Sequence, residues 1–110
     1  MPEKSDVEQN KAVSILSYIG ILFLVPLLAA PKSPFAQFHA RQGMVLFIAE
    51  IILWIVFYGL TFVTLGLMWF LLWVPWVCAV IWSIIGIVNV VNGEEKELPL
   101  IGGLIKKPSQ

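Results

Sequence analysis

Long apolar stretches separated by short polar segments dominate the chain. Residues 1–10 are polar and charged, residues 11–30 are almost wholly apolar, and two further apolar stretches cover residues 43–63 and 67–91. A helix needs about 20 apolar residues to cross the hydrocarbon core of a bilayer. Each of the three stretches is long enough, so the pattern predicts three transmembrane helices.

The boundaries of the second and third helices follow from local signals and from length. Ser33-Pro34 favours a helix start, with serine as the N-cap and proline in the first turn. A single helix over residues 43–91 would be about 73 Å long, far more than a bilayer core of about 30 Å. We therefore expect a turn within residues 61–66, and we interpret Pro75 as a kink in the third helix.

Two segments flank the predicted spans without crossing the membrane. Residues 35–42 carry an amphipathic pattern, which predicts an interfacial extension that runs without a break into the second helix. Residues 94–110 contain a short apolar run that is interrupted by Pro99, Gly102 and Gly103. That run is too short to span, so we expect it to lie on the interface or to fold back against it.

The composition supports an all-α integral membrane bundle, a single domain over residues 1–110. The chain is 59% hydrophobic and 13% charged, whereas soluble domains have about 25% charged residues. The net charge of zero argues against a nucleic-acid partner, which requires a basic face. The first apolar stretch follows an acidic leader and exceeds the usual signal-peptide core of about 7–15 residues, so we expect it to be retained.

The distribution of basic residues predicts an orientation. With three spans, Lys4 and Lys11 lie on the side of the N-terminus, and the other five basic residues lie on the opposite side. The positive-inside rule then places the C-terminus in the cytoplasm. We expect a multi-pass protein of the cell membrane whose first partner is the lipid bilayer.

Glu50 is the only ionisable acid or base between Gly43 and Asn92. A charged side chain at the centre of a spanning helix costs about 2.5–3.5 kcal/mol on insertion scales. Matching depths along two antiparallel helices predicts a hydrogen bond from Glu50 to Ser83, with Gly86 allowing close helix approach. Glu50 is then either a protonated structural residue or a site for a proton or cation.

A second polar group surrounds the entry of the second helix. His39, Arg41 and Gln42 are expected either to anchor the helix at lipid headgroups or to form a docking edge for a partner. Gln42, Asn89 and Asn92 lie at similar depth and are expected to form a polar contact between helices.

No catalytic or cofactor signature is present in the sequence. It lacks an HExxH motif, a glycine-rich phosphate loop and a Ser/His/Asp set, so we expect no enzyme activity and no cofactor. A lone histidine without companion ligands predicts no metal site. The single cysteine, Cys78, cannot form an internal disulfide.

Several segments resemble a known family: residues 12–28 (AVSILSYIGILFLVPLL), residues 33–47 (SPFAQFHARQGMVLF) and residues 98–103 (LPLIGG), together with Asn89 and Asn92. They are similar to the Tic-twenty-like family, small bacterial and archaeal membrane proteins related to a component of the chloroplast inner-envelope import translocon. The resemblance implies a helical membrane protein with a polar motif at the entry of a span. Its plastid members are four-span subunits of a protein-conducting complex, and its bacterial members are largely of unknown function.

Two functional hypotheses follow from the sequence. The first is a non-enzymatic subunit or scaffold that acts by helix–helix association, as a homo-oligomer or within a larger membrane complex; small residues in the spans favour it. The alternative is an oligomeric small transporter or channel that uses Glu50 as a cation or proton site. A third possibility is binding of a lipid headgroup by His39 and Arg41.

Overall fold

The computed structural model describes residues 3–104, and this part of the chain is helical without strands. Its elements, in chain order, are α1 (Lys4–Ile15), η1 (Leu16–Tyr18), η2 (Gly20–Phe23), α2 (Leu24–Ala29), α3 (Pro34–Val63), η3 (Trp69–Leu71), α4 (Trp73–Val91) and η4 (Gly102–Leu104). Lys106 and Lys107, part of the predicted interfacial tail, lie outside the described residues.

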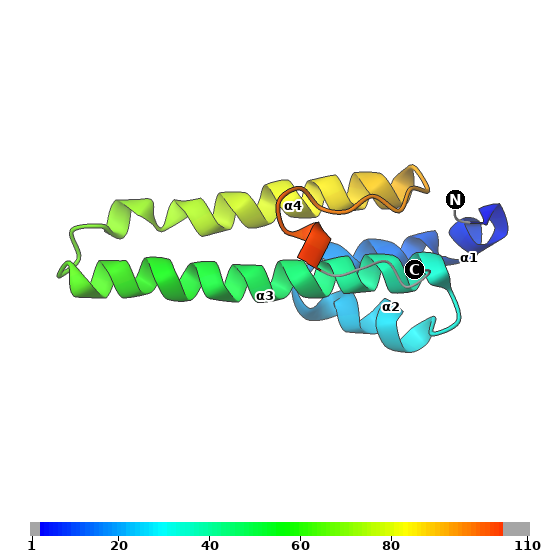
Figure 1. Cartoon of the computed structure of the whole chain (residues 1–110), viewed down its shortest axis with the longest axis horizontal. Helices are drawn as coiled ribbons and strands as arrows, with labels where there is room; N and C mark the ends of the chain where they lie inside the picture. Colours follow the sequence, from blue (N-terminus) through cyan, green and yellow to red (C-terminus); the bar gives the residue numbers. More distant parts are fainter. Residues whose placement is uncertain (1–2, 105–110) are drawn as a thin grey trace.

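Two long antiparallel helices, α3 and α4, form the frame of the molecule (Figure 1). Within residues 3–104, they alone are long and apolar enough to cross a membrane, counting η3 together with α4. The turn between them begins where it was expected: α3 ends at Val63, and Leu65 and Gly66 have φ values of 55° and 89°. Pro75 lies in the first turn of α4, where proline is tolerated, rather than at a kink in mid-helix.

The expected third span is not confirmed, because residues 11–30 do not form one continuous helix. The chain leaves helical geometry at Ile19, and Gly20 has a φ of 53°, a left-handed conformation that favours glycine. α1 and α2 are the two arms of a hairpin, and both lie beside the N-terminal half of α3 (Figure 1). We call residues 4–29 the N-terminal hairpin; both of its ends lie at the same end of the molecule.

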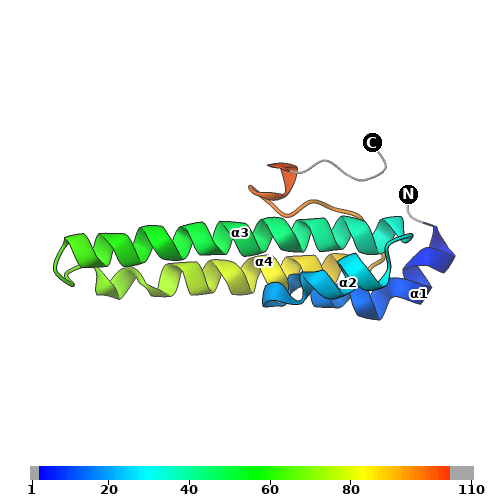
Figure 2. The ribbon, with the colours of Figure 1, turned by 90° about the horizontal axis from the view of Figure 1, so that it is seen from below.

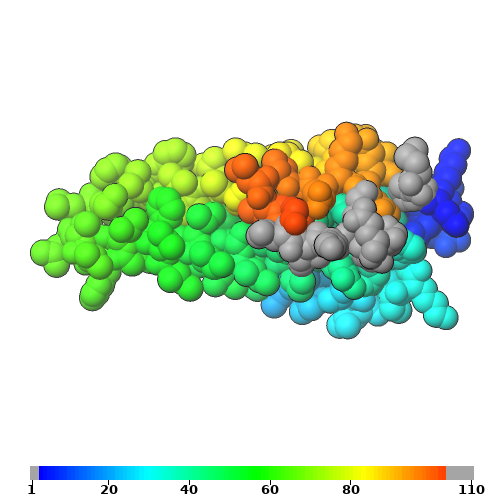
Figure 3. Space-filling view, viewed as in Figure 1, coloured from blue at the N-terminus to red at the C-terminus, as the bar shows by residue number. Residues whose placement is uncertain are grey.

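The buried core lies at that same end. The hairpin, α3, α4 and the segment after α4 all contribute apolar side chains to it: Val7, Tyr18, Phe35, Leu46, Val90 and Leu98. In α3, the last buried residue is Glu50, and the 13 residues after it contribute none to the core. The far halves of α3 and α4 therefore pack only against each other, as Figures 2 and 3 show.

The predicted amphipathic extension is a buried helix instead. Residues 35–42 do continue into the long apolar helix without a break, as expected. However, Phe35, Phe38 and His39 are at most 1% exposed, because the hairpin and the C-terminal residues cover them. This segment is the centre of the core and not an interfacial helix.

The far end of the molecule carries tryptophans on its surface. Trp69, Trp73 and Trp76 are each at least 60% exposed. Tryptophan favours the boundary between membrane and water, so their position after the turn is typical of residues at a membrane surface. The 20 residues of α3 that follow Gly43 span about 30 Å, which is the thickness of the hydrocarbon core.

Candidate functional site

The start of α3 is fixed by a cap from its own sequence and by a second one from the hairpin. Ser33 accepts a hydrogen bond from the Ala36 amide at 3.0 Å, as the sequence predicted. Asp6 accepts from the Ser33 hydroxyl, and its other carboxylate oxygen accepts from the Phe35 amide at 3.0 Å. A carboxylate at a helix N-terminus is favourable because it satisfies amides that have no partner within the helix.

Gln37 connects α3 to the end of α2. Its side-chain amide donates to the carbonyl oxygens of Leu27 at 3.0 Å and Ala30 at 3.1 Å. These carbonyls at the end of α2 lack partners within their own helix. The Ala30 carbonyl also accepts from the Ser33 amide at 3.2 Å, so the carbonyl that depends on Gln37 where the chain reverses between α2 and α3 is that of Leu27.

His39 is held between the hairpin and the C-terminal residues. Its Nδ1 lies 2.6 Å from the Tyr18 hydroxyl, and its Nε2 lies 2.8 Å from the Glu94 carbonyl oxygen. A carbonyl only accepts, so Nε2 carries the proton and Nδ1 accepts from Tyr18. The Tyr18 hydroxyl is therefore the donor of this hydrogen bond. Both ring nitrogens are thus occupied, which leaves neither for a metal or a substrate.

Gln42 binds the returning C-terminal segment, residues 94–104, which we call the C-terminal strap. Its amide donates to the Gly102 carbonyl at 3.0 Å, and its carbonyl accepts from the Leu98 amide at 2.9 Å. From α4, Trp82 donates to the Pro99 carbonyl at 2.9 Å and Asn89 to the Lys96 carbonyl at 3.4 Å. The predicted contact between Gln42 and Asn89 is indirect: both residues hold the same strap.

The remaining member of the polar group, Arg41, is separated from the others. It is exposed on the surface of α3, whereas His39 and Gln42 are at most 1% exposed. The two buried residues are engaged by hydrogen bonds inside the molecule, whereas the Arg41 side chain is at its surface. His39 and Arg41 therefore do not form a docking edge or a headgroup site together in this structure.

Two glycines let the tip of the hairpin approach the long helices. A Cβ atom on Gly43 would overlap the backbone carbonyl of Ser17, and one on Gly86 would overlap the Tyr18 ring. Close approach at Gly86 was expected, but its neighbour is the hairpin rather than α3. Asp6, Tyr18 and Gln37 were not predicted as members of the site; the available signal was Tyr18, a polar side chain within the apolar stretch 11–30.

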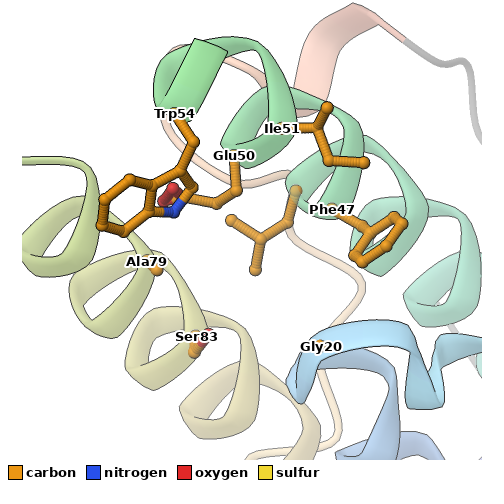
Figure 4. Close-up of a pocket in the computed structure, with 8 residues that line it drawn as sticks. Gly20, Phe47, Glu50, Ile51, Trp54, Ala79 and Ser83 are labelled. Atoms are coloured by element: carbon orange, nitrogen blue, oxygen red, sulfur yellow. The ribbon is translucent and has the colours of Figure 1, made fainter. Parts of the chain in front are cut away.

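Glu50 lines a pocket between α3, α4 and the tip of the hairpin. The cavity has a volume of about 270 Å³. Its principal lining residues come from all three parts: Gly20, Phe47, Glu50, Trp54, Ala79 and Ser83. Figure 4 shows the Glu50 side chain directed toward the side of the pocket that Trp54 and Ala79 line.

The predicted hydrogen bond between Glu50 and Ser83 is wrong, although both residues line the same pocket. Glu50 is 9% exposed. Both of its carboxylate oxygens are buried without a hydrogen-bond partner in the described part of the chain. The two residues lie at the same depth, as predicted. Depth alone does not determine in which direction a side chain points from its helix, and a hydrogen bond requires both.

Residues 3–104 contain no group of three or more His, Cys, Asp or Glu side chains that could hold a metal ion. The polar contacts at the start of α3 are structural, and the Glu50 carboxylate is the one unpartnered charged group described in the core. These features define the chain as a small all-helical membrane protein with two helices apolar enough to span.

A family model described as the magnetosome magnetite crystal formation protein family, MamF/MmsF, matches residues 9–105. The chain therefore belongs to the MamF/MmsF family. This finding corrects the resemblance to the Tic-twenty-like family and removes the link to a translocon. No curated protein and no solved structure shows significant similarity to the chain.

Proposed function

We propose that this chain is a non-enzymatic structural protein of a magnetosome membrane, where it shapes the bilayer as magnetite crystals form. The link to magnetite formation rests on the family description. The structural role rests on one observation: the two halves of the molecule differ in cross-section. The half that holds the N-terminal hairpin contains α1, α2, the adjoining parts of α3 and α4, and the strap. The other half contains only the remaining parts of α3 and α4 with η3 and the turn between them (Figures 1 and 2).

The depth of the hairpin supports this proposal. Its tip, Gly20, lines the same pocket as Glu50, which lies seven residues along α3 from Gly43. Seven helical residues rise about 10 Å, and one leaflet of the hydrocarbon core is about 15 Å thick. In our proposal the hairpin enters one leaflet and returns, so the chain crosses the membrane twice and is wider in that leaflet.

The molecule is a wedge, wide at the N-terminal hairpin and narrow at the turn between α3 and α4. Its charges favour one orientation in the membrane. Five basic residues belong to the wide half, Lys4, Lys11, Lys32, Arg41 and Lys96, and the turn between α3 and α4 has none. The positive-inside rule places the wide half in the cytoplasmic leaflet. A protein that is wider in the cytoplasmic leaflet favours a membrane that bulges into the cytoplasm, as a membrane around a small particle inside a cell must do.

Association between copies would increase this effect, because the bending of many wedges adds up. The exposed far halves of α3 and α4 include Gly59, where an added Cβ would meet nothing within the chain. Small residues of this kind allow close contact between helices in a membrane. We therefore propose that the protein acts as a homo-oligomer or within a larger membrane complex.

The wedge predicts that orientation in reconstituted vesicles depends on vesicle size. In small sonicated vesicles most chains will insert with the wide end, and hence the N-terminus, facing outward, because the outer leaflet is expanded there. In giant vesicles made with the same lipids the two orientations will approach equality. Protease access to an N-terminal tag measures the fraction that faces outward; an equal fraction in both vesicle sizes would rule out the wedge.

A second candidate function is favoured by a specific observation, the unpartnered Glu50 carboxylate in its pocket. Two long helices enclose no pathway alone, so a transporter or channel would require several copies. Flux of protons or monovalent cations through proteoliposomes tests this candidate, which requires the flux to disappear in Glu50→Gln.

A further inference from the structure

The pocket beside Glu50 has the features of a binding site for a ligand. A buried carboxylate without a hydrogen-bond donor is unfavourable, because it has lost its water without gaining a partner. Glu50 is also one of the residues that line a cavity of about 270 Å³, which is far larger than one water molecule requires. A ligand that brings both a positive charge and a hydrogen-bond donor would supply what Glu50 lacks.

The lining residues restrict the chemistry of that ligand. Glu50 contributes the only charge, and Ser83 contributes a hydroxyl; the other principal lining residues are apolar or aromatic. Mg²⁺ and Ca²⁺ need six or more oxygen ligands, or a retained water shell, which this lining does not provide. Trp54 and Phe47 instead offer aromatic faces, which attract organic cations through cation–π interactions.

We propose that this pocket binds a protonated amine with a small apolar body. The ammonium group would donate to the Glu50 carboxylate, with Ser83 as a second acceptor, and the apolar body would lie against Trp54 and Phe47. This proposal is independent of the wedge, because it depends on the lining of the pocket and not on the cross-section of the two halves. An amine-bearing lipid headgroup and a free amine share this chemistry.

The test is equilibrium binding of radiolabelled butylamine to the full chain in phosphatidylcholine nanodiscs. We expect a saturable component of one amine per chain above the background of empty nanodiscs. Glu50→Gln, which keeps the shape of the side chain, should weaken it by at least about tenfold through loss of the charge-assisted hydrogen bond. Unlabelled butanol should compete poorly because it lacks the charge.

A second variant keeps the test decisive if Glu50→Gln fails to fold. Ala79→Leu keeps the carboxylate but narrows the pocket, so it should weaken binding strongly, whereas Ala12→Leu, the same change at an exposed position on α1 outside the pocket, should not change it. Adding phosphatidylethanolamine to the nanodiscs separates the two sources: competition identifies the lipid headgroup, and unchanged binding identifies a free amine. No saturable component, or one that survives both Glu50→Gln and Ala79→Leu, would overturn the proposal.

Discussion

Replacing Gly43 by leucine will displace the N-terminal hairpin from the two long helices. A Cβ at this position would occupy the space of the Ser17 carbonyl, and backbone atoms cannot move aside as a flexible side chain can. Overpacking of this kind costs about 1–3 kcal/mol, and the upper end applies because the obstacle is backbone. The hairpin, rather than the α3–α4 pair, should lose its order.

Amide hydrogen exchange in nanodiscs measures that loss. Amides of residues 16–23 should exchange faster by about 100-fold, the factor that corresponds to about 3 kcal/mol, while amides of residues 76–84 keep their protection. Gly59→Leu is the matched control, since nothing in the chain lies within 4 Å of a Cβ at Gly59. Equal exchange of residues 16–23 in both variants would mean that the hairpin does not dock on Gly43.

Replacing Gln42 by leucine will release the C-terminal strap. The side chain is 1% exposed and satisfies two backbone groups of the strap, the Leu98 amide and the Gly102 carbonyl. Leucine has a similar volume but no polar atoms, so both groups must find water instead. A buried polar group that loses its partner costs about 1–3 kcal/mol.

The Leu98 amide reports this release directly. We expect it to exchange about 30-fold faster in Gln42→Leu, corresponding to about 2 kcal/mol for local opening. Gln9→Leu, an exposed position on α1, serves as the control and should leave the strap unchanged. Unchanged protection of Leu98 in Gln42→Leu would show that Trp82 and Asn89 hold the strap without Gln42.

The sequence predicted those features that depend on one local signal or on chain length. Ser33-Pro34 marked the start of α3, and the length of the apolar region required the turn near Gly66. These are properties of neighbouring residues, so a single sequence contains them.

The hairpin was missed for a physical reason. Residues 11–30 are apolar whether they cross the membrane once or enter and return, because lipid and core side chains surround them in either case. Only Gly20, Ser17 and Tyr18 distinguish the two arrangements, and their meaning depends on partners 20 or more residues away, such as His39 and Gly86. Asp6 illustrates the same limit: it lies in the first turn of α1, but its carboxylate caps α3.

The site was predicted in part. Glu50 and Ser83 were correctly placed at the same depth, and the pocket they share confirms that they lie close together. Their hydrogen bond was wrong because Glu50 is directed toward Trp54 and Ala79 (Figure 4). The roles of His39 and Gln42 could not be inferred, since both bind backbone atoms of the strap, which carry no sequence signal, and the other partner of His39, the Tyr18 hydroxyl, is 21 residues away.

Cysteine accessibility on intact cells of a bacterial host without magnetosomes, in which the chain inserts into the cell membrane, tests the central claim, that the chain crosses the membrane twice and that its hairpin returns to the side it entered. In a Cys78→Ser background, single cysteines at Ser5, Lys32 and Leu65 are treated with a membrane-impermeant thiol reagent. The account predicts that Ser5→Cys and Lys32→Cys behave alike, protected until the membrane is opened, while Leu65→Cys reacts from outside. Reaction of Ser5→Cys together with Leu65→Cys, and protection of Lys32→Cys, would contradict it and restore three spans.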